Sequence, residues 1–439
     1  MLNNNTTTVH RLSHDGRGIA TVDQKTVFIV GALPEEMVTF KVIKKHRRYL
    51  EAEAMSIRNE SPLRQTPPCP HFSQCGGCNL QHMADAAELQ FKQQLLIEQL
   101  QTLGSVTPDI ILPPLSAQTL GYRRKARLGV RWVKKKNKLL IGFRERSGRY
   151  LADLSGCVVL HPKVGEQFEA LRTLILSLSI AHNIPQIEIA IGDEQTALIF
   201  RHMQPLLLED EERLKQFGEQ YHFDIYTQPN PPLPLKQLWQ TGFKERLTYS
   251  LPDEALTFLF HPLDFTQVHL EVNRLMVAKA LSLLEIKKDE TVLDLYCGIG
   301  NFTLPLAKRA KQVTGVEGSQ EMVRRAKENA QFNQIDNVDF WATNLDDANL
   351  MQQNASWINA KYDKILIDPP RVGAKNVLTF IEQWQPQRIV YISCNPSTLA
   401  RDAKWLTENC KYRLHQAGIM NMFPQTSHVE VIAVFNREE

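Results

Sequence analysis

The sequence predicts a multidomain protein with a small β-barrel at its N-terminus, a β-rich central domain and a C-terminal α/β domain built on a doubly wound sheet. The chain has 439 residues, enough for about two to four domains. Residues 1–60 alternate short apolar runs with turns, which is typical of a small β-barrel. From residue 266 onwards strands alternate with helices, which is typical of a sheet covered by helices. We therefore expect domains at 1–60, 61–265 and 266–439.

The composition indicates a globular cytoplasmic protein that binds nucleic acid. No run approaches the roughly 18 apolar residues of a membrane span, and the N-terminus lacks the apolar core of a secretory signal. The net charge is only +3, yet residues 122–150 carry twelve Lys or Arg, one acidic residue and four aromatic residues. A second basic cluster spans residues 41–49. A solvated face is the plainer interpretation of one basic cluster, but two clusters with aromatic residues favour RNA or DNA.

The N-terminal barrel is predicted from the turns between its strands. The sequences DGRGIA, residues 15–20, and GALPEE, residues 31–36, place glycine between β-rich runs. This segment resembles the TRAM domain, an OB-like RNA-binding barrel found on RNA-modifying enzymes. The resemblance rests on these two turns and implies that residues 1–60 contact RNA.

A loop rich in proline and cysteine, residues 61–82, opens the central domain. Four cysteines are candidate metal ligands, three in this loop and one far downstream: Cys69, Cys75, Cys78 and Cys157. Four thiols suit either an iron–sulfur cluster or a structural zinc ion. Zinc sites more often use two Cys-x-x-Cys pairs, so the single distant cysteine favours the cluster. The odd total of seven cysteines argues against a disulfide framework.

A helix is predicted at roughly 84–103, and the rest of the central domain is predicted to be β-rich. A turn at Gly192-Asp193-Glu194 joins two β runs in a hairpin, and residues 248–262 form another. Residues 226–235 are a proline-rich loop. Residues 160–250 carry no pattern to which chemistry can be assigned.

The C-terminal domain is predicted from seven β runs and four helices. The β runs are residues 291–297, 312–317, 338–344, 364–370, 388–394, 412–420 and 428–435. The helices are expected near residues 301–310, 319–333, 375–383 and 397–409. This alternation predicts a doubly wound sheet.

A glycine turn follows the first strand of this domain. Asp294 precedes Gly298 and Gly300, and Glu317 ends the next strand. A dinucleotide fingerprint needs a third glycine where Thr303 stands, whereas an acid at the second strand end suits hydrogen bonds to ribose hydroxyls. The pattern resembles the Rossmann-like S-adenosylmethionine methyltransferases, and an NAD enzyme is the alternative.

This second resemblance implies a site for S-adenosylmethionine. Gly298 and Gly300 would let the backbone approach the cofactor closely. Tyr296 and Asn301 would border its amino-acid or sugar part, and Glu317 would hold the ribose. Asn344, at the end of the third strand, would lie beside the adenine, although members of this class often carry Asp there.

The thiol of Cys394 is expected at the carboxyl end of a strand, where open α/β sheets bind ligands. An apolar run, 388–393, precedes it, and Asn-Pro and a helical pattern follow. A buried structural role is commoner for a lone cysteine. A thiolate at this place could instead add to C6 of a uracil and make C5 nucleophilic enough to take a methyl group. The start of the following helix is expected to lower the pKa of the thiol.

Glu430 is predicted to be the base that removes the C5 proton after methyl transfer. As part of an antiparallel last strand, it would lie at the rim where the parallel strands end. A carboxylate in an otherwise apolar strand is unusual for a structural residue. His428 is a rival base. Asp294 and Asp368 are expected to converge with Cys394 on the same crevice.

Four segments together resemble the RNA uracil-C5 methyltransferase family: DLYCGIGNFTLPLA, IDPPR, ISCNPSTLARD and FPQTSHVEVIAVF. The resemblance implies that Cys394 is the nucleophile and Glu430 the proton-abstracting base. It places Asp368, in IDPPR, on the cofactor or the base, and Gln267, in DFTQVH, on the cofactor. It also implies a [4Fe-4S] cluster bound by the four candidate metal ligands, Cys69, Cys75, Cys78 and Cys157.

The N-terminal barrel and the cysteine cluster indicate which RNA is the substrate within this family. Transfer-RNA enzymes generally lack both the barrel and the cysteine cluster, and one ribosomal branch has the cluster alone. This chain has both, so it most resembles the branch that acts on uracil 1939 of 23S ribosomal RNA, with the target uridine flipped out of its stack. The alternatives are a dual-site ribosomal or transfer-RNA uracil methyltransferase, a cytosine-C5 enzyme and a non-catalytic iron–sulfur RNA-binding protein. We expect a monomer with no membrane partner.

Overall fold

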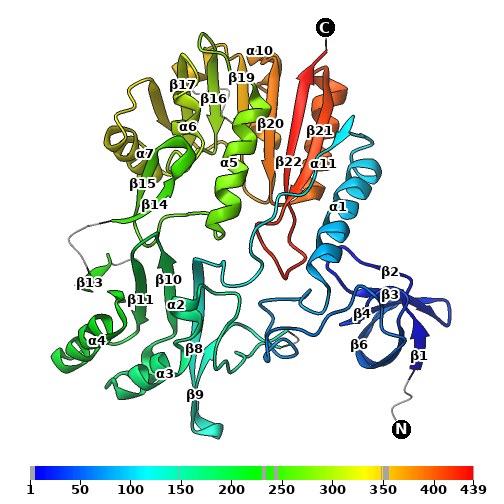
Figure 1. The fold of residues 1–439 in the computed structure, drawn as a ribbon, viewed down its shortest axis with the longest axis vertical. Coiled ribbons are helices and arrows are strands. Elements are labelled where there is room, and N and C mark those ends of the chain that lie inside the picture. The colour runs from blue at the N-terminus through cyan, green and yellow to red at the C-terminus, as the bar shows by residue number, and fades with distance from the viewer. Residues whose placement is uncertain are drawn as a thin grey trace.

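The computed structural model describes residues 5–146, 148–229, 234–241, 246–347, 349 and 355–438. Figure 1 shows a helix-covered sheet at the top, a second sheet with helices at the lower left and a small barrel at the lower right. Within the described ranges no helix is both long and apolar enough to cross a membrane. The middle of the expected proline-rich loop, residues 230–233, lies outside the described residues.

Six strands form the N-terminal barrel, as predicted: β1 (Asn5–Thr8), β2 (Arg11–Leu12), β3 (Gly18–Val22), β4 (Lys25–Val30), β5 (Met37–Lys45) and β6 (Tyr49–Arg58). They are hydrogen-bonded in the order β1-β5-β6-β4-β3-β2. Apolar side chains on one face of the strands, including Val27, Ile29 and Phe40, are fully buried. Gly16 and Gly31, in the two predicted turns, both have φ of +80°, which glycine adopts without strain.

The central part is a second six-stranded sheet: β8 (Lys125–Val133), β9 (Lys138–Gly142), β10 (Gln186–Ile191), β11 (Thr196–His202), β12 (Asp224–Pro229) and β13 (Lys236–Trp239). The predicted hairpin around Gly192 is formed by β10 and β11. This part also contains helices that the sequence analysis did not predict: α2 (Pro162–Gly165), α3 (Phe168–Ser177) and α4 (Leu208–Tyr221). The buried residues Asp210, Leu214 and Phe217 of α4 follow helical spacing, so the periodicity was present in the sequence.

The C-terminal sheet has the predicted strands: β16 (Thr291–Leu295), β17 (Gln312–Glu317), β18 (Val338–Ala342), β19 (Lys364–Ile367), β20 (Arg388–Ser393), β21 (Tyr412–Met420) and β22 (Glu430–Arg437). Its order is β18-β17-β16-β19-β20-β22-β21-β7, with β7 at Ile110–Ile111. The strands from β18 to β20 are parallel, whereas β22 is antiparallel to β20. The doubly wound sheet is therefore present, and its antiparallel strand β22 lies between β20 and β21.

Helices cover both faces of this sheet: α5 (Leu270–Leu284), α6 (Thr303–Ala307), α7 (Gln320–Phe332), α8 (Ser356–Asn359), α9 (Lys375–Leu378), α10 (Ile381–Trp384) and α11 (Pro396–Asn409). Helix α5 was not predicted from the sequence, and the single helix expected at 375–383 is two short helices, α9 and α10. Successive residues of β20 point to opposite faces, so that Val390 and Ile392 join one core while Ile389 and Tyr391 join the other. With both faces buried, the carboxyl ends of the strands are the natural place for a ligand site.

Two segments that the sequence analysis assigned to the central domain pack on the C-terminal sheet. Helix α1 (Asp85–Thr102) lies against α11 and β21, and its Leu96 and Leu100 belong to the core on that side of the sheet. The predicted hairpin of β14 (Leu247–Leu251) and β15 (Leu256–Phe260) contacts α7. Figure 1 shows α1 beside α11 and β14 with β15 below α7.

Candidate active site

A cavity of about 660 Å³ opens at the carboxyl ends of β16, β17, β19 and β20. Eight of the ten predicted catalytic and cofactor residues line it: Gln267, Tyr296, Gly298, Glu317, Asn344, Asp368, Cys394 and Glu430. These residues are separated by up to 163 positions in the sequence, from 267 to 430. The sheet topology brings them together because parallel strands end at one edge.

Two of the predicted cofactor residues, Gly300 and Asn301, do not line this cavity. The Asn301 amide is bonded on both sides: its Nδ2 donates to Asn273 Oδ1 at 2.9 Å, and its Oδ1 accepts from the Tyr249 hydroxyl at 2.9 Å. Asn301 therefore ties α5 and β14 to the glycine turn. Gly300 contributes a backbone conformation, with φ of +91°.

Cys394 lies in the short turn between β20 and α11. Asn395 caps the helix by accepting from Ser397 N at 3.1 Å, and Pro396 follows at the first helical position. The Nδ2 of Asn395 also donates to the carbonyl of Arg371 at 3.1 Å. The SCNP turn and the DPPR turn are thus hydrogen-bonded to each other at the rim of the cavity.

The expected lowering of the Cys394 pKa is wrong for the free protein. Burial raises the pKa of this thiol to about 11, and the nearby carboxyls of Glu430 and Asp368 act in the same direction. The Arg371 guanidinium opposes them but is outweighed. The start of α11 does not overcome desolvation at this position, because a thiolate away from water is costly.

Glu430 lies next to Cys394 because of the antiparallel register. Ser393 of β20 pairs with Val431 of β22. Cys394 follows Ser393 and Glu430 precedes Val431, so the two residues lie side by side where β20 ends and β22 begins. Its side chain is buried, with a relative exposure of 4% for the residue. Burial raises the pKa of Glu430 well above its ordinary value, and Asp368 adds to this. A carboxylate held in this environment is a stronger base than one in water.

The two aspartates expected at the crevice differ in position. Asp368 lines the cavity, and burial raises its pKa to about 7. Asp294 is fully buried and does not line the cavity. Its Oδ2 accepts from the Thr303 hydroxyl at 2.5 Å, and burial raises its pKa to about 8. The prediction that Asp294 reaches the crevice is wrong: it supports the glycine turn from below.

The opposite wall of the cavity is formed by hydrogen-bonded turns. Glu317 accepts from Gly298 N at 3.2 Å and from Ser319 N at 2.9 Å, which joins the ends of β16 and β17. Tyr296 has a positive φ of +63°, which is costly for a residue with a side chain. Strain of this kind clusters at ligand sites. Asn344 accepts from Asp346 N at 3.1 Å.

Several lining residues were not assigned from the sequence: Phe265, Met322, Asp346, Arg371, Phe423. Phe265 is 66% exposed at the mouth of the cavity, two positions before Gln267. In the sequence, the available signal for this lining residue was an aromatic side chain two positions from a predicted cofactor residue. Arg371 donates to His428 Nδ1 at 2.8 Å. That contact joins two turns and required the tertiary structure.

A second cavity of about 250 Å³ is lined by all four predicted metal ligands: Cys69, Cys75, Cys78 and Cys157. Burial raises the pKa of Cys78 to about 12. Phe423 and His428 line both this cavity and the larger one, so the two share a wall. In the described part of the chain no three His, Cys, Asp or Glu side chains form a group that could hold a metal ion.

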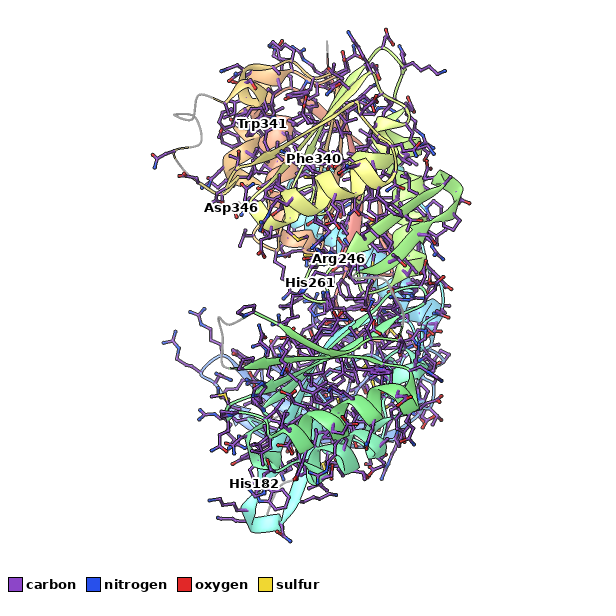
Figure 2. All side chains as sticks on the ribbon, turned by 90° about the vertical axis from the view of Figure 1, so that its left-hand side faces the viewer. His182, Arg246, His261, Phe340, Trp341 and Asp346 are labelled. Carbon is purple, nitrogen blue, oxygen red and sulfur yellow. The ribbon has the colours of Figure 1, made fainter. Side chains whose placement is uncertain are left out.

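The basic stretch 122–150 divides into inward and outward side chains. Arg124 donates to the carbonyl of Gly192 at 2.6 Å, and Lys125 donates to that of Pro262 at 3.0 Å, so both are structural. Four arginines further along line a groove of about 750 Å³: Arg127, Arg131, Arg144 and Arg149. In the same groove Trp132 stacks on His182 with ring centroids 4.4 Å apart. Figure 2 shows His182 at the far end of the molecule from Phe340 and Trp341.

A doubly wound sheet with a thiol, a carboxylate and a glycine turn around one cavity defines the Rossmann-like methyltransferase class. The solved tRNA (uracil-54, C5)-methyltransferase of Pyrococcus abyssi, in complex with S-adenosyl-L-homocysteine, shares the fold with a TM-score of 0.75. The two chains are 24% identical, over 99% of this chain and 100% of that one. Residues 240–438 match the model for tRNA (Uracil-5-)-methyltransferase, and residues 6–55 match the TRAM domain.

Close relatives cover nearly the whole chain. A protein of Francisella tularensis subsp. novicida named 23S rRNA (uracil(1939)-C(5))-methyltransferase RlmD is 48% identical over 97% of this chain and 95% of its own length. A protein of Legionella pneumophila strain Paris with the same name is 45% identical over 99% and 98%. The chain belongs to the RNA uracil-C5 methyltransferase family.

Proposed function

We propose that this protein transfers a methyl group from S-adenosylmethionine to C5 of uracil 1939 in 23S ribosomal RNA. The close relatives carry that name over nearly the whole chain. The observation that carries the chemistry is the pairing of β20 with β22, which sets Cys394 beside Glu430 in one cavity. A covalent route needs a nucleophile and a base on the same pyrimidine ring, and this cavity offers both.

The residues of this chain account for the steps on the base. The Cys394 thiol first loses its proton to water, and the resulting thiolate forms a bond to C6, so that the electron pair of the C5–C6 double bond becomes available at C5. S-adenosylmethionine supplies the methyl group that C5 takes. Glu430 then removes the C5 proton, and the electrons of that C–H bond restore the double bond as the C6–sulfur bond breaks. The thiolate is regenerated, the donor would leave as neutral S-adenosylhomocysteine, and the positive charge of its sulfonium leaves as the proton that Glu430 takes, so atoms and charge balance.

The cofactor is assigned to the wall opposite Cys394. Glu317 would hold the ribose hydroxyls, Asn344 would lie beside the adenine, and Tyr296 and Gln267 would border the amino-acid part. The backbone at Gly298 leaves room for close approach: a Cβ built there meets only Met322 Cε, at 4.0 Å. Asp368 would accept from the cofactor or the base. These residues fit a polar cationic ligand.

RNA is assigned to the barrel and to the arginine-lined groove of the central sheet. Arg131 and Arg149 would contact phosphates, while Trp132 and His182 offer aromatic surface to unstacked bases. The target uridine must leave its stack to reach Cys394, because a stacked base does not expose C6 to a side chain. We propose a cytoplasmic monomer of three domains, with α1 and the β14–β15 hairpin packed on the C-terminal one.

The experiment that tests this function maps 5-methyluridine in RNA. Cells lacking the protein are expected to lose the modification at uracil 1939 of 23S ribosomal RNA and to keep every other 5-methyluridine. Reintroducing the wild-type chain should restore it. Loss at a second ribosomal site would instead establish a dual-site enzyme, and loss in transfer RNA alone would refute the ribosomal assignment. Transfer of the methyl group to cytidine would indicate the cytosine-C5 alternative.

We propose that the cysteine cavity holds a [4Fe-4S] cluster, which would draw together four thiols that do not form a metal-ligand group in the described residues. Four thiols border a space whose other walls include Phe72, Phe143 and Leu154, and such apolar shells surround iron–sulfur clusters. Two contacts hold the loop in place: Gln81 Oε1 accepts from Cys69 N at 3.1 Å, and Arg146 donates to the carbonyl of Phe72 at 2.7 Å. The cluster has no step in the methyl transfer, so its role would be to hold the loop and the RNA surface.

Protein purified without oxygen is expected to be brown and to contain about four irons per chain. Replacing Cys78 with serine should remove the iron, because Ser is a poor ligand for this cluster. The matched control is Cys410→Ser, which removes a buried thiol outside the cavity and should keep the iron. Iron content and visible absorbance measure the result. A colourless protein that contains zinc would contradict the assignment.

A further inference from the structure

A buried ion pair on helix α1 contacts the loop that leads to Glu430. Glu88 and Lys92 lie one helical turn apart, with 2.6 Å between Oε1 and Nζ. Both residues are buried, at 0% and 1% exposure. A lysine withdrawn from water in this way is rare unless it is paired. The proposed methyl transfer uses neither residue.

Both charges of this pair reach the loop of residues 421–429. Lys92 Nζ donates to Asn421 Oδ1 at 2.7 Å and to the carbonyl of Phe423 at 3.1 Å. The Glu88 carboxylate accepts from Gln425 N, with its nearer oxygen at 2.9 Å. The pair therefore satisfies three polar groups of a loop whose next residue is Glu430.

The other side of the loop is held by segments that carry no catalytic group. The carbonyl of Gln425 accepts from Asn79 N and Leu80 N, both at 3.1 Å. The Tyr122 hydroxyl donates to the carbonyl of Pro424 at 3.0 Å. These contacts anchor the loop from its second side. Two residues of the loop, Phe423 and His428, form the wall shared by the two cavities.

Helix α1 also contacts the helix that begins after Cys394. Gln99 Oε1 accepts from the Ser397 hydroxyl at 2.8 Å, and Ser397 lies in the first turn of α11. One rigid helix thus touches the segment before the proposed base and the segment after the proposed nucleophile. A helix does not shorten or bend easily, so it is suited to fix the spacing between two such segments.

We propose that Glu88 and Lys92 are positioning residues for Glu430: the ion pair fixes the 421–429 loop and thereby aims the Glu430 carboxylate at the C5 proton. The inference rests on the proposed function, because it assigns the pair to the last step of that reaction. It predicts that a variant of the pair completes the bond to C6 and the methyl transfer but is slow to release the product.

The test uses Lys92→Met in the full-length protein, with kcat, KM for RNA and the fraction of protein in a covalent RNA adduct as readouts. We expect kcat to fall by about 10- to 100-fold, as a misplacement of roughly 1 Å does. KM for RNA should change less than about threefold, and the adduct should accumulate on uridine RNA. With 5-fluorouridine RNA, which has no C5 proton to lose, the variant should form adduct at the wild-type rate.

The matched control is Lys364→Met. Lys364 is a buried lysine 3.8 Å from Glu290 at the amino end of β19, the opposite edge of the sheet from the cavity. It should lose stability without accumulating adduct. If Lys92→Met does not fold, Asn421→Ala removes only the loop partner and should show the same adduct in smaller amount.

Three outcomes separate this inference from the proposed function. If Lys92→Met and Asn421→Ala lose stability but accumulate no adduct, as expected for Lys364→Met, the ion pair is only structural and the inference is wrong. If kcat falls without adduct on uridine RNA, or if adduct formation on 5-fluorouridine RNA slows, the pair acts before proton removal and the inference is also wrong. If the wild type forms no adduct with either RNA, the proposed function itself fails.

Discussion

Replacing Cys394 with alanine is expected to reduce methyl transfer by at least about 10⁴-fold, equivalent to about 5 kcal/mol in activation free energy. Without the thiol no bond forms at C6, and C5 of a neutral uracil is too weak a nucleophile to take the methyl group. RNA binding should be kept, because the barrel and the arginine groove are untouched. Transfer of a labelled methyl group and RNA affinity, measured on the same preparation, test the prediction.

Cys410→Ala is the matched control for this variant. Cys394 and Cys410 flank α11 at its two ends, and Cys410 is 8% exposed. Both substitutions remove a thiol that flanks α11, but only Cys394 lines the cavity. The control should keep full activity. Turnover by Cys394→Ala above the expected limit would rule out covalent catalysis, and loss of activity in Cys410→Ala would show that α11 is merely sensitive to substitution.

Replacing Glu430 with glutamine is expected to trap protein and RNA in a covalent adduct that survives denaturation. Glutamine keeps the shape of the side chain, but its amide cannot accept the C5 proton. The steps up to methyl transfer should proceed, whereas turnover should fall by about 10²- to 10⁴-fold, the usual contribution of a general base. A band of protein joined to RNA on a denaturing gel, together with methylation of the trapped base, measures the result.

His428→Ala is the control, since His428 is the rival base. Its Nδ1 accepts from Arg371, and burial together with nearby cations lowers the pKa of His428. The His428 ring is neutral, but its Nδ1 already accepts a hydrogen bond from the Arg371 guanidinium. Glu430 lies beside Cys394 on the neighbouring strand and has no such partner to displace among the described residues. The control should accumulate little adduct. Adduct in His428→Ala and none in Glu430→Gln would reverse the assignment of the base.

The sequence predicted the site more fully than the fold around it. Cys394 and Glu430 could be chosen because each is a reactive residue in an unusual local context, a strand end and an apolar strand. Helix α5 was missed although its buried residues Val277, Leu281 and Leu284 follow helical spacing. Asn301 was assigned to the cofactor by resemblance to the S-adenosylmethionine methyltransferases. The structure commits its amide to neighbouring elements, which no local pattern reveals.

The sequence by itself determined which residues we propose to react, the strands from β16 to β22 of the C-terminal part, the barrel and the four cysteines. These features are local, since they depend on the spacing and chemistry of residues close together in the chain. Only the tertiary structure decided that Glu430 lies beside Cys394, that burial raises the pKa of the thiol to about 11, and that Asp294 lies beneath the cavity. Desolvation depends on packing from every side, which a sequence does not state. The contact between Lys92 and Asn421 joins residues 329 positions apart, and such pairs exist only once the sheet has aligned its strands.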